Sequence, residues 1–415
     1  MKFLNNIPRY AIYSLLVFTP LARGSLPGWS ITTIHLVTLI ALGTFLLEKS
    51  ITWNWKSIKI PHCIPIIFLL LFCSISFFYS TNFYTSFWAM ALLFNYLVIF
   101  YLIICTVQTR AQFRQLVYLI VGIAAFLSIF GLFKWGGVNP FPWWEYDLVG
   151  YNKGMLSATY YNHNHLAGYL EMAIPMTLGL FLTGLKKERL IFIIILTLIL
   201  FSALILSLSR GGWIGAFVGL SFFVIVLLLN RHFNKKKLLS ILAVGFVVIA
   251  FIVLSSTTTV KRILSFEQQS EIQSFRARTI IWKGAIQAIK IRPLLGTGPG
   301  TFSTIFTQYQ PPGFTVRHFR ALNDYLHFTT ELGLPIIAIM VWMAIILYKK
   351  GFSKLQNPSR FVRGVTLGAM SGITAILVHS IVDFNLHIPA NALLFTVLTA
   401  IVIAPVPTYN QNESE

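Results

Sequence analysis

An arginine followed by two glycines interrupts two long apolar runs in the segment from Leu206 to Trp213. A charge beside hydrocarbon is unfavourable by a few kcal/mol unless it has a partner or reaches water. Arginine is also the side chain best shaped to bind phosphate oxygens through two parallel hydrogen bonds. Gly211 and Gly212 would let the backbone turn and approach whatever Arg210 binds. The segment predicts an anion site or, in the simpler alternative, an arginine that reaches water from a helix end.

A second basic segment, residues 274–292, has helical periodicity and contains Arg278 among other basic side chains. The glycine-rich stretch 293–302 that follows is as typical of a tight turn as of an anion cradle. A basic helix of this kind usually faces water or contacts anionic lipid headgroups. If it lies beside Arg210 at the same membrane surface, Arg278 could instead bind a diphosphate.

Ionisable side chains recur at helical spacing after Arg320. At 3.6 residues per turn, Asp324, His327 and Glu331 fall on one helix face. Ionisable groups on a membrane span normally face the bundle interior or a water-filled cavity. They indicate either a reactive site or a paired polar contact without chemistry. His379 and the polar residues of 383–391 add further groups near the ends of the last two apolar runs.

The cluster of Asn and His at 162–165 opens another apolar run, where Asn164 is expected to cap a helix. His163 and His165 would supply two ligands to a metal ion, and no third ligand is evident. The sequence contains no P-loop, zinc or Rossmann pattern. We therefore predict no metal site, no nucleotide and no cofactor.

The elements that must position these residues are membrane helices. The 415-residue chain is 56% hydrophobic and only 11% charged, with a mean hydropathy of +0.74. A soluble domain would need far more charge to cover its surface. We predict an all-α, polytopic membrane protein with about 12 transmembrane helices, forming a single transmembrane domain over residues 1–415. The expected spans are roughly 7–22, 29–48, 62–80, 84–105, 113–134, 165–183, 189–207, 211–230, 237–256, 326–348, 361–381 and 389–405.

The basic residues give this bundle an orientation. With the N-terminus in the cytoplasm, most of the 32 Lys and Arg residues fall on cytoplasmic segments. Most of the others lie in one large periplasmic loop after the ninth span, residues 257–325, and loops of that length translocate largely regardless of charge. The sequence therefore predicts both termini in the cytoplasm. The net charge of +20 mostly reflects this topology and gives no support for nucleic-acid binding.

With these residues in place, the sequence resembles the O-antigen ligase and polymerase family of bacterial envelope glycosyltransferases. The resemblance covers the length, the twelve spans and the large late loop. It also covers four local patterns: 162–169, 209–215, 278–302 and 323–335. It implies an enzyme of the bacterial inner membrane that moves a glycan from undecaprenyl diphosphate to an acceptor at the periplasmic face, without nucleotide or metal.

The resemblance also implies roles for particular residues. The arginine of the family's Ser-Arg-Gly-Gly pattern corresponds to Arg210, and the loop arginine four residues before a tryptophan corresponds to Arg278. Both are expected to bind the diphosphate. Preorganised guanidinium groups stabilise the negative charge that accumulates on such a leaving group. Supporting roles are expected for Arg320, Asn323, Gly211, Gly212 and His379.

The chain departs from the ligase pattern at one position. In the ligases a histidine precedes the Asn, Ser or Gln that stands ten residues before a glycine. Here Asn323 and Gly333 keep that spacing, but the preceding residue is Leu322. His318 is our first substitute as the base for the acceptor hydroxyl, if the helix extends back past Arg320. Asp324 and His327 are the other catalytic candidates, although His327 is turned by about 140° from Leu322.

The sequence thus favours ligation of O-antigen to lipid A-core, in lipopolysaccharide biosynthesis, with polymerisation of glycan repeat units nearly as well supported. The partners would be an undecaprenyl-diphosphate-linked glycan donor, a lipid A-core or glycan acceptor, and membrane lipids. Transfer to a protein acceptor, as in a protein O-oligosaccharyltransferase, stays open, as does a non-enzymatic envelope assembly factor. A transporter or flippase would need polar residues deep in the bilayer and often shows inverted repeats, and no internal repeat is evident.

Overall fold

The protein is an all-helical bundle in the computed structural model, which describes residues 2–53, 55, 63–142, 154–230, 232–233, 276–311 and 318–407 and contains no strand among them. The helices of its N-terminal part are α1 (Lys2–Leu21), α2 (Gly28–Thr52), α3 (Cys63–Phe78), α4 (Phe83–Thr106), α5 (Arg110–Trp135), α6 (His163–Phe181), α7 (Lys187–Leu206) and α8 (Arg210–Leu229). The C-terminal part contains α11 (Phe302–Phe306), α12 (Asp324–Leu332), α13 (Pro335–Lys354), α14 (Arg360–His379) and α15 (Pro389–Ile403). Short 3₁₀ turns are η1 (Arg23–Ser25), η4 (Thr307–Tyr309) and η5 (Asn385–His387).

Seven of the described helices are long and apolar enough to cross a membrane: α2, α4, α5, α7, α8, α13 and α14. The shorter α3 and α15 are also apolar. The predicted all-helical membrane fold is therefore confirmed at this level. The predicted ninth span, 237–256, and the start of the predicted loop lie outside the described residues.

One predicted span is wrong. Residues 326–348 were expected to form a single helix, but α12 ends at Leu332 and α13 begins at Pro335. Gly333 between them has a φ of 81°, and its N–H donates to the Thr329 carbonyl to close α12. Proline at the first position of α13 fits a new helix start, because its missing N–H would have no intrahelical acceptor there.

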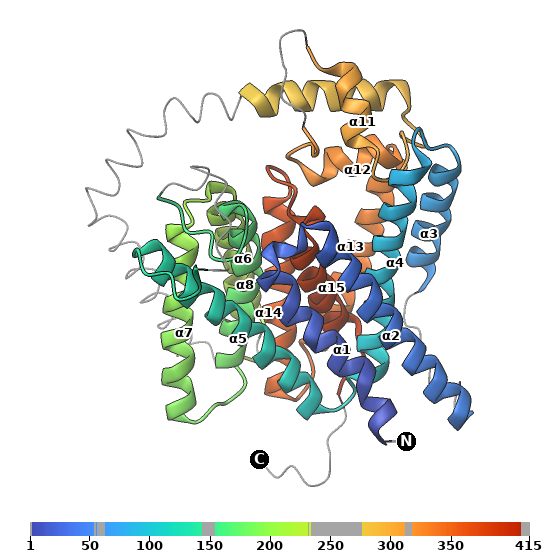
Figure 1. Ribbon diagram of the computed structural model, residues 1–415. Helices are drawn as coiled ribbons and strands as arrows, with labels where there is room; N and C mark the ends of the chain where they lie inside the picture. The colour runs from blue at the N-terminus through green and yellow to red at the C-terminus, as the bar shows by residue number, and fades with distance from the viewer. Residues whose placement is uncertain are drawn as a thin grey trace.

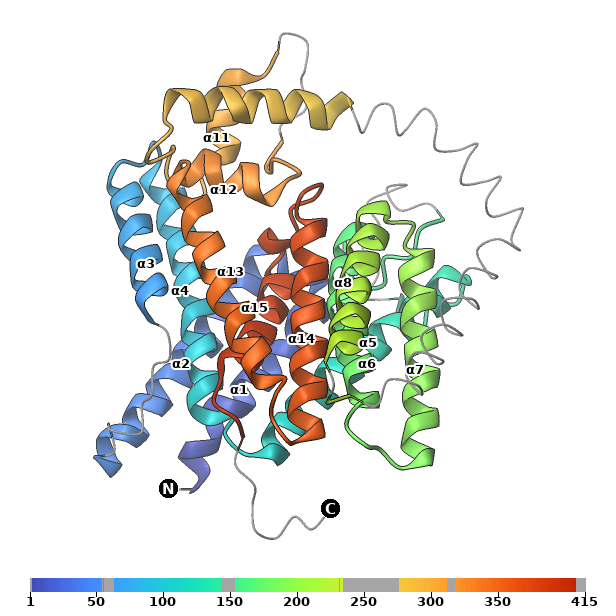
Figure 2. The same ribbon diagram turned by 180° about the vertical axis from the view of Figure 1, so that it is seen from behind.

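The long helices lie side by side, and α12, α11 and a helix over residues 276–291 lie across one end of them (Figures 1 and 2). We call these three elements, with the turn 292–301, the cap. Trp282 donates its indole N–H to the Ala321 carbonyl at 3.0 Å, and Ile281, Phe302 and Phe306 form a small apolar core inside the cap. α1 begins and α15 ends at the opposite end of the bundle (Figure 1).

The cap is attached to the hairpin of α3 and α4 by polar side chains. Ser76 donates to the Leu295 carbonyl at 2.8 Å, and Ser86 donates to the Pro299 carbonyl at 2.6 Å. Thr81 donates both its backbone N–H and its hydroxyl to the Thr297 carbonyl. Since each bond satisfies a backbone oxygen of the turn, the cap is held in a defined place over the bundle.

Three helices in the centre of the bundle approach each other closely along glycines. On α14, a Cβ at Gly364, Gly368 or Gly372 would lie 2.3–2.7 Å from backbone oxygens of α6. On α8, a Cβ at Gly219 would lie 2.7 Å from the Ser371 oxygen of α14. Small residues at this four-residue spacing allow helix backbones to meet in a membrane protein. They fix the ends of α6, α8 and α14 relative to one another.

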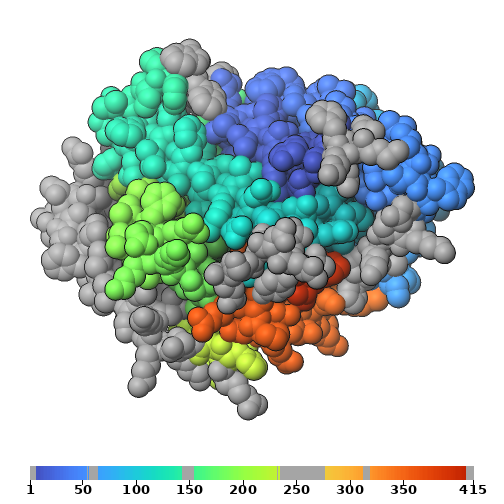
Figure 3. Space-filling view, turned by 90° about the horizontal axis from the view of Figure 1, so that it is seen from below, coloured from blue at the N-terminus to red at the C-terminus, as the bar shows by residue number. Residues whose placement is uncertain are grey.

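Seen from the end at which α1 begins, segments from the first, middle and last parts of the chain lie next to each other (Figure 3). On this face α1 and α2 (blue) adjoin α5 (teal). The ends of α7 (green) and of α13 and α14 (orange) lie on the same face. No part of the chain forms a separate lobe among the described residues of this face.

Candidate active site

Buried polar side chains gather at the end of the bundle beneath the cap. At the end of α14, Nδ1 of His379 lies 3.0 Å from Oε1 of Glu171 on α6, so the ring N–H can donate to the carboxylate. Asp383 lies between two histidines, with one oxygen 4.0 Å from Nε2 of His379 and the other 3.9 Å from Nε2 of His165. All four side chains are almost completely buried. We call His165, Glu171, His379 and Asp383 the inner cluster.

Arg210 lies beside this inner cluster, as the first residue of α8. Ser209 caps the helix by accepting the Gly212 N–H at 3.2 Å. Gly211 packs against His379, where a Cβ would meet the ring at 2.6 Å. The Arg210 side chain itself is exposed. An exposed guanidinium at a helix N-terminus combines two features that attract anions.

The interpretation of Gly211 and Gly212 as a backbone turn is wrong. Both glycines lie inside the first turn of α8 and have no positive φ. A Cβ at Gly212 would lie 2.6 Å from the Ala167 side chain on α6. The glycines therefore allow α8 to pack closely against α6 and α14, which places Arg210 at the inner cluster.

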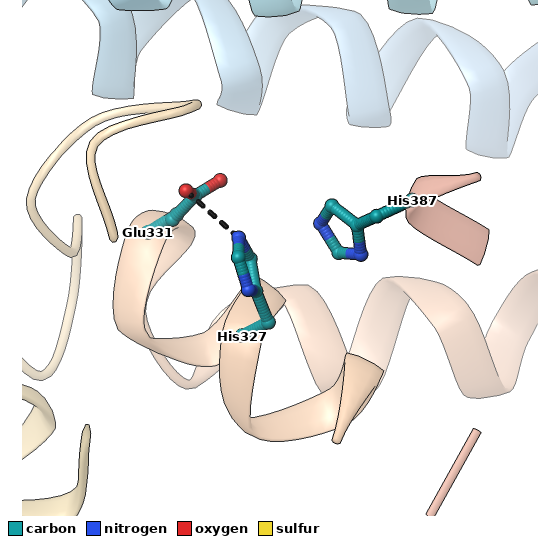
Figure 4. A group of neighbouring side chains, drawn as sticks. All are labelled: His327, Glu331 and His387. Carbon is teal, nitrogen blue, oxygen red and sulfur yellow. Dashed lines mark hydrogen bonds and ion pairs between the residues drawn. The ribbon is translucent and has the colours of Figure 1, made fainter. Parts of the chain in front are cut away.

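The face predicted for α12 is present, but its residues form two separate pairs. Nε2 of His327 lies 3.0 Å from Oε1 of Glu331, one turn further along the helix (Figure 4). Nδ1 of His327 accepts the Ala321 N–H at 3.2 Å, so Nε2 carries the ring proton and donates it to Glu331. Both nitrogens of His327 are thus engaged, and the side chain is fully buried.

Glu331 joins α12 to the glycine-rich turn of the cap. Its Oε2 accepts the Gly300 N–H at 2.8 Å, and its Oε1 accepts the Phe302 N–H at 3.0 Å. Gly296, Gly298 and Gly300 all have positive φ values, which glycine adopts at least strain. Of the two readings of this stretch, the tight turn is the one observed, and its N–H groups bind a carboxylate of the protein itself.

Three ionisable side chains in or just before the cap helix α12 have shifted pKa values. Burial lowers the pKa of His327 to about 4, so that this ring is neutral near pH 7. Burial alone would raise the pKa of Glu331, but His327 and the Phe302 N–H outweigh it and bring the pKa to about 2. Burial also lowers the pKa of Arg320, an effect that the Glu331 and Asp324 carboxylates oppose.

Asp324 pairs with His387, a residue of η5 in the connection between α14 and α15. Oδ1 of Asp324 lies 2.5 Å from Nδ1 of His387, and Oδ2 accepts the Leu386 N–H at 2.9 Å. The Asp324 N–H donates to the Ser380 and Asp383 carbonyls. Asp324 is completely buried, whereas 13% of the His387 side chain is exposed. The start of α12 is therefore bound to the same connection that carries Asp383 of the inner cluster.

His318 does not share a helix face with these groups, contrary to prediction. α12 begins at Asp324, and Asn323 caps it by accepting the Leu326 N–H at 3.0 Å. Leu322 has a φ of 53°, so the chain is not helical before the cap residue. His318 instead lies with its ring 6.2 Å from that of Phe306, and burial lowers its pKa.

The other expected residues lie near the same end. Asn323 has a structural role as helix cap, and Arg320 lies half-buried just before it. Arg278 belongs to the helix over 276–291, which begins on the side of the bundle where α8 begins (Figure 2). The Arg278 Nε is buried without a hydrogen-bond partner. On α6 the cap residue is Asn162, which accepts the Asn164 N–H, so the prediction of Asn164 as the cap is wrong.

Two residues of the site were missed by the sequence analysis. Glu171 lies within an apolar run, and an ionisable residue in a span is itself a signal of a functional or paired position. His387 was grouped with the polar residues near the last span but had no assigned partner. Its partner is 63 residues away along the chain, so spacing alone cannot reveal the pair.

His327, Glu331 and His387 each bring one ligand-type atom to within 4.8 Å of the others. Figure 4 shows the three side chains converging from α12 and η5. However, both nitrogens of His327 are hydrogen-bonded, and both oxygens of Glu331 accept backbone N–H groups. A metal ion would have to displace these bonds. The donor set therefore fits a hydrogen-bonded network better than a metal centre.

The fold and the site together define a multi-pass helical membrane protein with a polar, histidine- and carboxylate-rich site at one end. The sequence model of the O-antigen ligase family matches residues 194–341, which contain Arg210, the cap and α12. This match confirms the resemblance to the O-antigen ligase family over that part of the chain. No curated protein matches the chain.

Proposed function

We propose that the protein is a bacterial inner-membrane glycosyltransferase that moves a glycan from undecaprenyl diphosphate to an acceptor at the periplasmic face. The main support is Arg210, an exposed guanidinium at the N-terminus of α8 within the family match. Arg210 would bind the diphosphate with Arg278, whose Nε is buried without a partner, and Arg320 would add positive charge nearby. These groups stabilise the negative charge that develops on the leaving diphosphate.

The proposed topology places the cap on the periplasmic side. It keeps about 12 spans in a single transmembrane domain over residues 1–415, both termini in the cytoplasm and the large periplasmic loop at 257–325. The cap and the start of α1 lie at opposite ends of the bundle, which agrees with this arrangement (Figure 1). The sequence predicts Asp324, His327 and His318 as catalytic candidates and His379 in a supporting place, which lies beside Gly211.

O-antigen ligation to lipid A-core is our first choice of reaction. Polymerisation of repeat units is the second, because Leu322 occupies the position of the ligase histidine. The two differ only in the acceptor: a core sugar for the ligase, and a second lipid-linked glycan for the polymerase. Both use the same diphosphate donor and the same arginines.

Gel analysis of lipopolysaccharide and lipid-linked glycan from a deletion strain tests this proposal. Loss of a ligase leaves full-length polymer on the lipid carrier, whereas loss of a polymerase leaves single repeat units. Complementation with the wild-type gene should restore the normal pattern, and Arg210→Ala should not. A deletion strain with unchanged lipopolysaccharide and unchanged lipid-linked glycan contradicts both assignments.

A further inference from the structure

We infer that His387, oriented by Asp324, is the general base that deprotonates the acceptor hydroxyl. The inference rests on the proposed glycan transfer. It assigns the base to the connection between α14 and α15 rather than to the segment around Leu322, where the ligase histidine would stand.

The pair has the geometry of a base held by a carboxylate. The Nδ1–H of His387 donates to Oδ1 of Asp324 at 2.5 Å, which leaves the Nε2 lone pair available. The hydrogen bond of the His387 ring among the described residues is this one, through Nδ1. A buried carboxylate in this position fixes the tautomer of the ring and stabilises the imidazolium that forms when Nε2 takes a proton.

The surroundings of His387 keep the ring in place. It stacks on Phe328 with ring centroids 4.6 Å apart and lies 3.9 Å from the His327 ring. Asp324 in turn is held by the Leu386 N–H and by its own N–H bonds to the Ser380 and Asp383 carbonyls. A base supported by packing and by secondary hydrogen bonds is preorganised for proton transfer.

The other histidines of the site are less suitable. His327 has both nitrogens engaged and no exposed surface. His379 donates to Glu171 and is only 1% exposed, and His165 is 3% exposed. Of these four histidines, His387 alone combines a carboxylate on one nitrogen with a side chain that is 13% exposed.

The connection that carries His387 also reaches the proposed diphosphate site. It starts at His379, against which Gly211 packs, and it continues through Asp383 to His387. Arg210 and His387 therefore flank one short stretch of chain. A donor whose diphosphate contacts Arg210 would therefore bind beside this connection.

The proposed step is a single displacement. The acceptor hydroxyl oxygen attacks the anomeric carbon of the lipid-linked sugar and forms the new glycosidic bond. The bond from that carbon to the diphosphate oxygen breaks, and its electron pair leaves with the diphosphate. The hydroxyl proton passes to Nε2 of His387 and is then released to water. No oxidant, reductant or metal is needed for this balance.

The test uses the purified full-length protein in detergent, with an undecaprenyl-diphosphate-linked glycan and lipid A-core as substrates. His387→Gln should lower kcat by about 10²- to 10⁴-fold, the usual contribution of a general base, and leave KM for the donor unchanged. In His387→Gly, added imidazole should restore part of the rate. His232→Gln is the matched control, because His232 is exposed just beyond the end of α8 that is remote from the cap.

Asp324 acts through His387 as a positioning residue, so its role is tested by separate variants and by their kcat and donor KM. Asp324→Asn should lower kcat by at least tenfold at unchanged donor KM, because the amide cannot hold the required tautomer. Asp324→Glu should recover part of that loss. Added imidazole should restore a larger part of the rate in His387→Gly than in the double variant that also carries Asp324→Asn.

The outcomes separate the two proposals. If wild type transfers glycan and His387→Gln does so at the same rate, the assignment of the base is wrong while the proposed function stands. The same conclusion follows if His318→Ala is inactive and His387→Gln is active. If neither wild type nor His232→Gln transfers glycan from the lipid diphosphate to this acceptor or to a second lipid-linked glycan, the proposed function itself fails.

Discussion

Three carboxylates beneath or within the cap each bind a histidine: Glu171 with His379, Asp324 with His387, and Glu331 with His327. All three pairs join a carboxylate to a histidine, and they differ in how far the histidine side chain is exposed. Burying a carboxylate without a partner is strongly unfavourable, so pairing is expected wherever these groups leave water. Only the exposure of the histidine distinguishes a structural pair from one that can contact substrate. That criterion selects the pair of Asp324 and His387.

Arg210 is the residue on which the proposed donor site depends. Arg210→Ala should abolish glycan transfer and leave the amount of protein in the membrane unchanged, because the side chain is exposed. Arg210→Lys should restore only part of the activity, since an ammonium cannot make the bidentate contact. Activity is measured by gel analysis of the product, and protein by immunoblot.

The control for Arg210 is Arg189→Ala, another exposed arginine, near the start of α7 at the other end of the bundle. It should transfer glycan at the wild-type rate. Near-normal turnover in Arg210→Ala would return Arg210 to the simpler alternative of an arginine that only reaches water.

Glu331 should be needed for the stability of the cap. In Glu331→Gln one of the two oxygens becomes an NH₂ group, which faces a backbone N–H instead of accepting from it. Leaving such a buried donor unsatisfied is unfavourable by about 1–3 kcal/mol. We expect a lower Tm in detergent for Glu331→Gln. Glu188→Gln, which changes an exposed glutamate in α7, should leave Tm unchanged. Equal Tm values for both variants would contradict this stabilising role of Glu331.

At the scale of the elements, the site depends on how closely α6, α8 and α14 approach one another. The glycines of α8 and α14 remove side chains where the helix backbones meet. This contact brings the start of α8 against the end of α14, where Gly211, the residue after Arg210, packs against His379. Gly211 and Gly212 thus serve helix packing. From the sequence, they were expected to let the backbone approach the ligand of Arg210.

A single methyl group tests this packing. Gly219→Ala should destabilise the protein by about 1–3 kcal/mol, because the new Cβ would lie 2.7 Å from the Ser371 oxygen and force the helices apart. Gly43→Ala in α2 is the matched control, since a Cβ there meets nothing within 4 Å. Thermal unfolding in detergent measures both, and a Gly219→Ala protein as stable as Gly43→Ala would show that the interface adapts.

At the scale of the whole molecule, the sequence predicted the helices better than the site. Apolar runs of membrane length mark the spans, because a chain in hydrocarbon must satisfy its backbone internally. The break at Gly333 was missed, since the apolar pattern continues through α13 without a polar gap. Pairs such as Glu171 with His379 join residues 208 positions apart, and only tertiary packing determines them. Local spacing did predict that His327 and Glu331 share one helix face, on which the structure pairs them.

The orientation of the whole bundle decides whether the site can act on periplasmic glycans. In a variant without Cys63, Cys73 and Cys105, a cysteine at Gln308, in η4 directly after α11 of the cap, should react with a membrane-impermeant maleimide in intact spheroplasts. A cysteine at Lys187, at the start of α7, should react only after the membrane is permeabilised. Both positions are exposed, so a difference in labelling reports the side of the membrane rather than burial. Reversed labelling would put the cap, Arg210 and His387 in the cytoplasm, where a donor presented in the periplasm could not reach them.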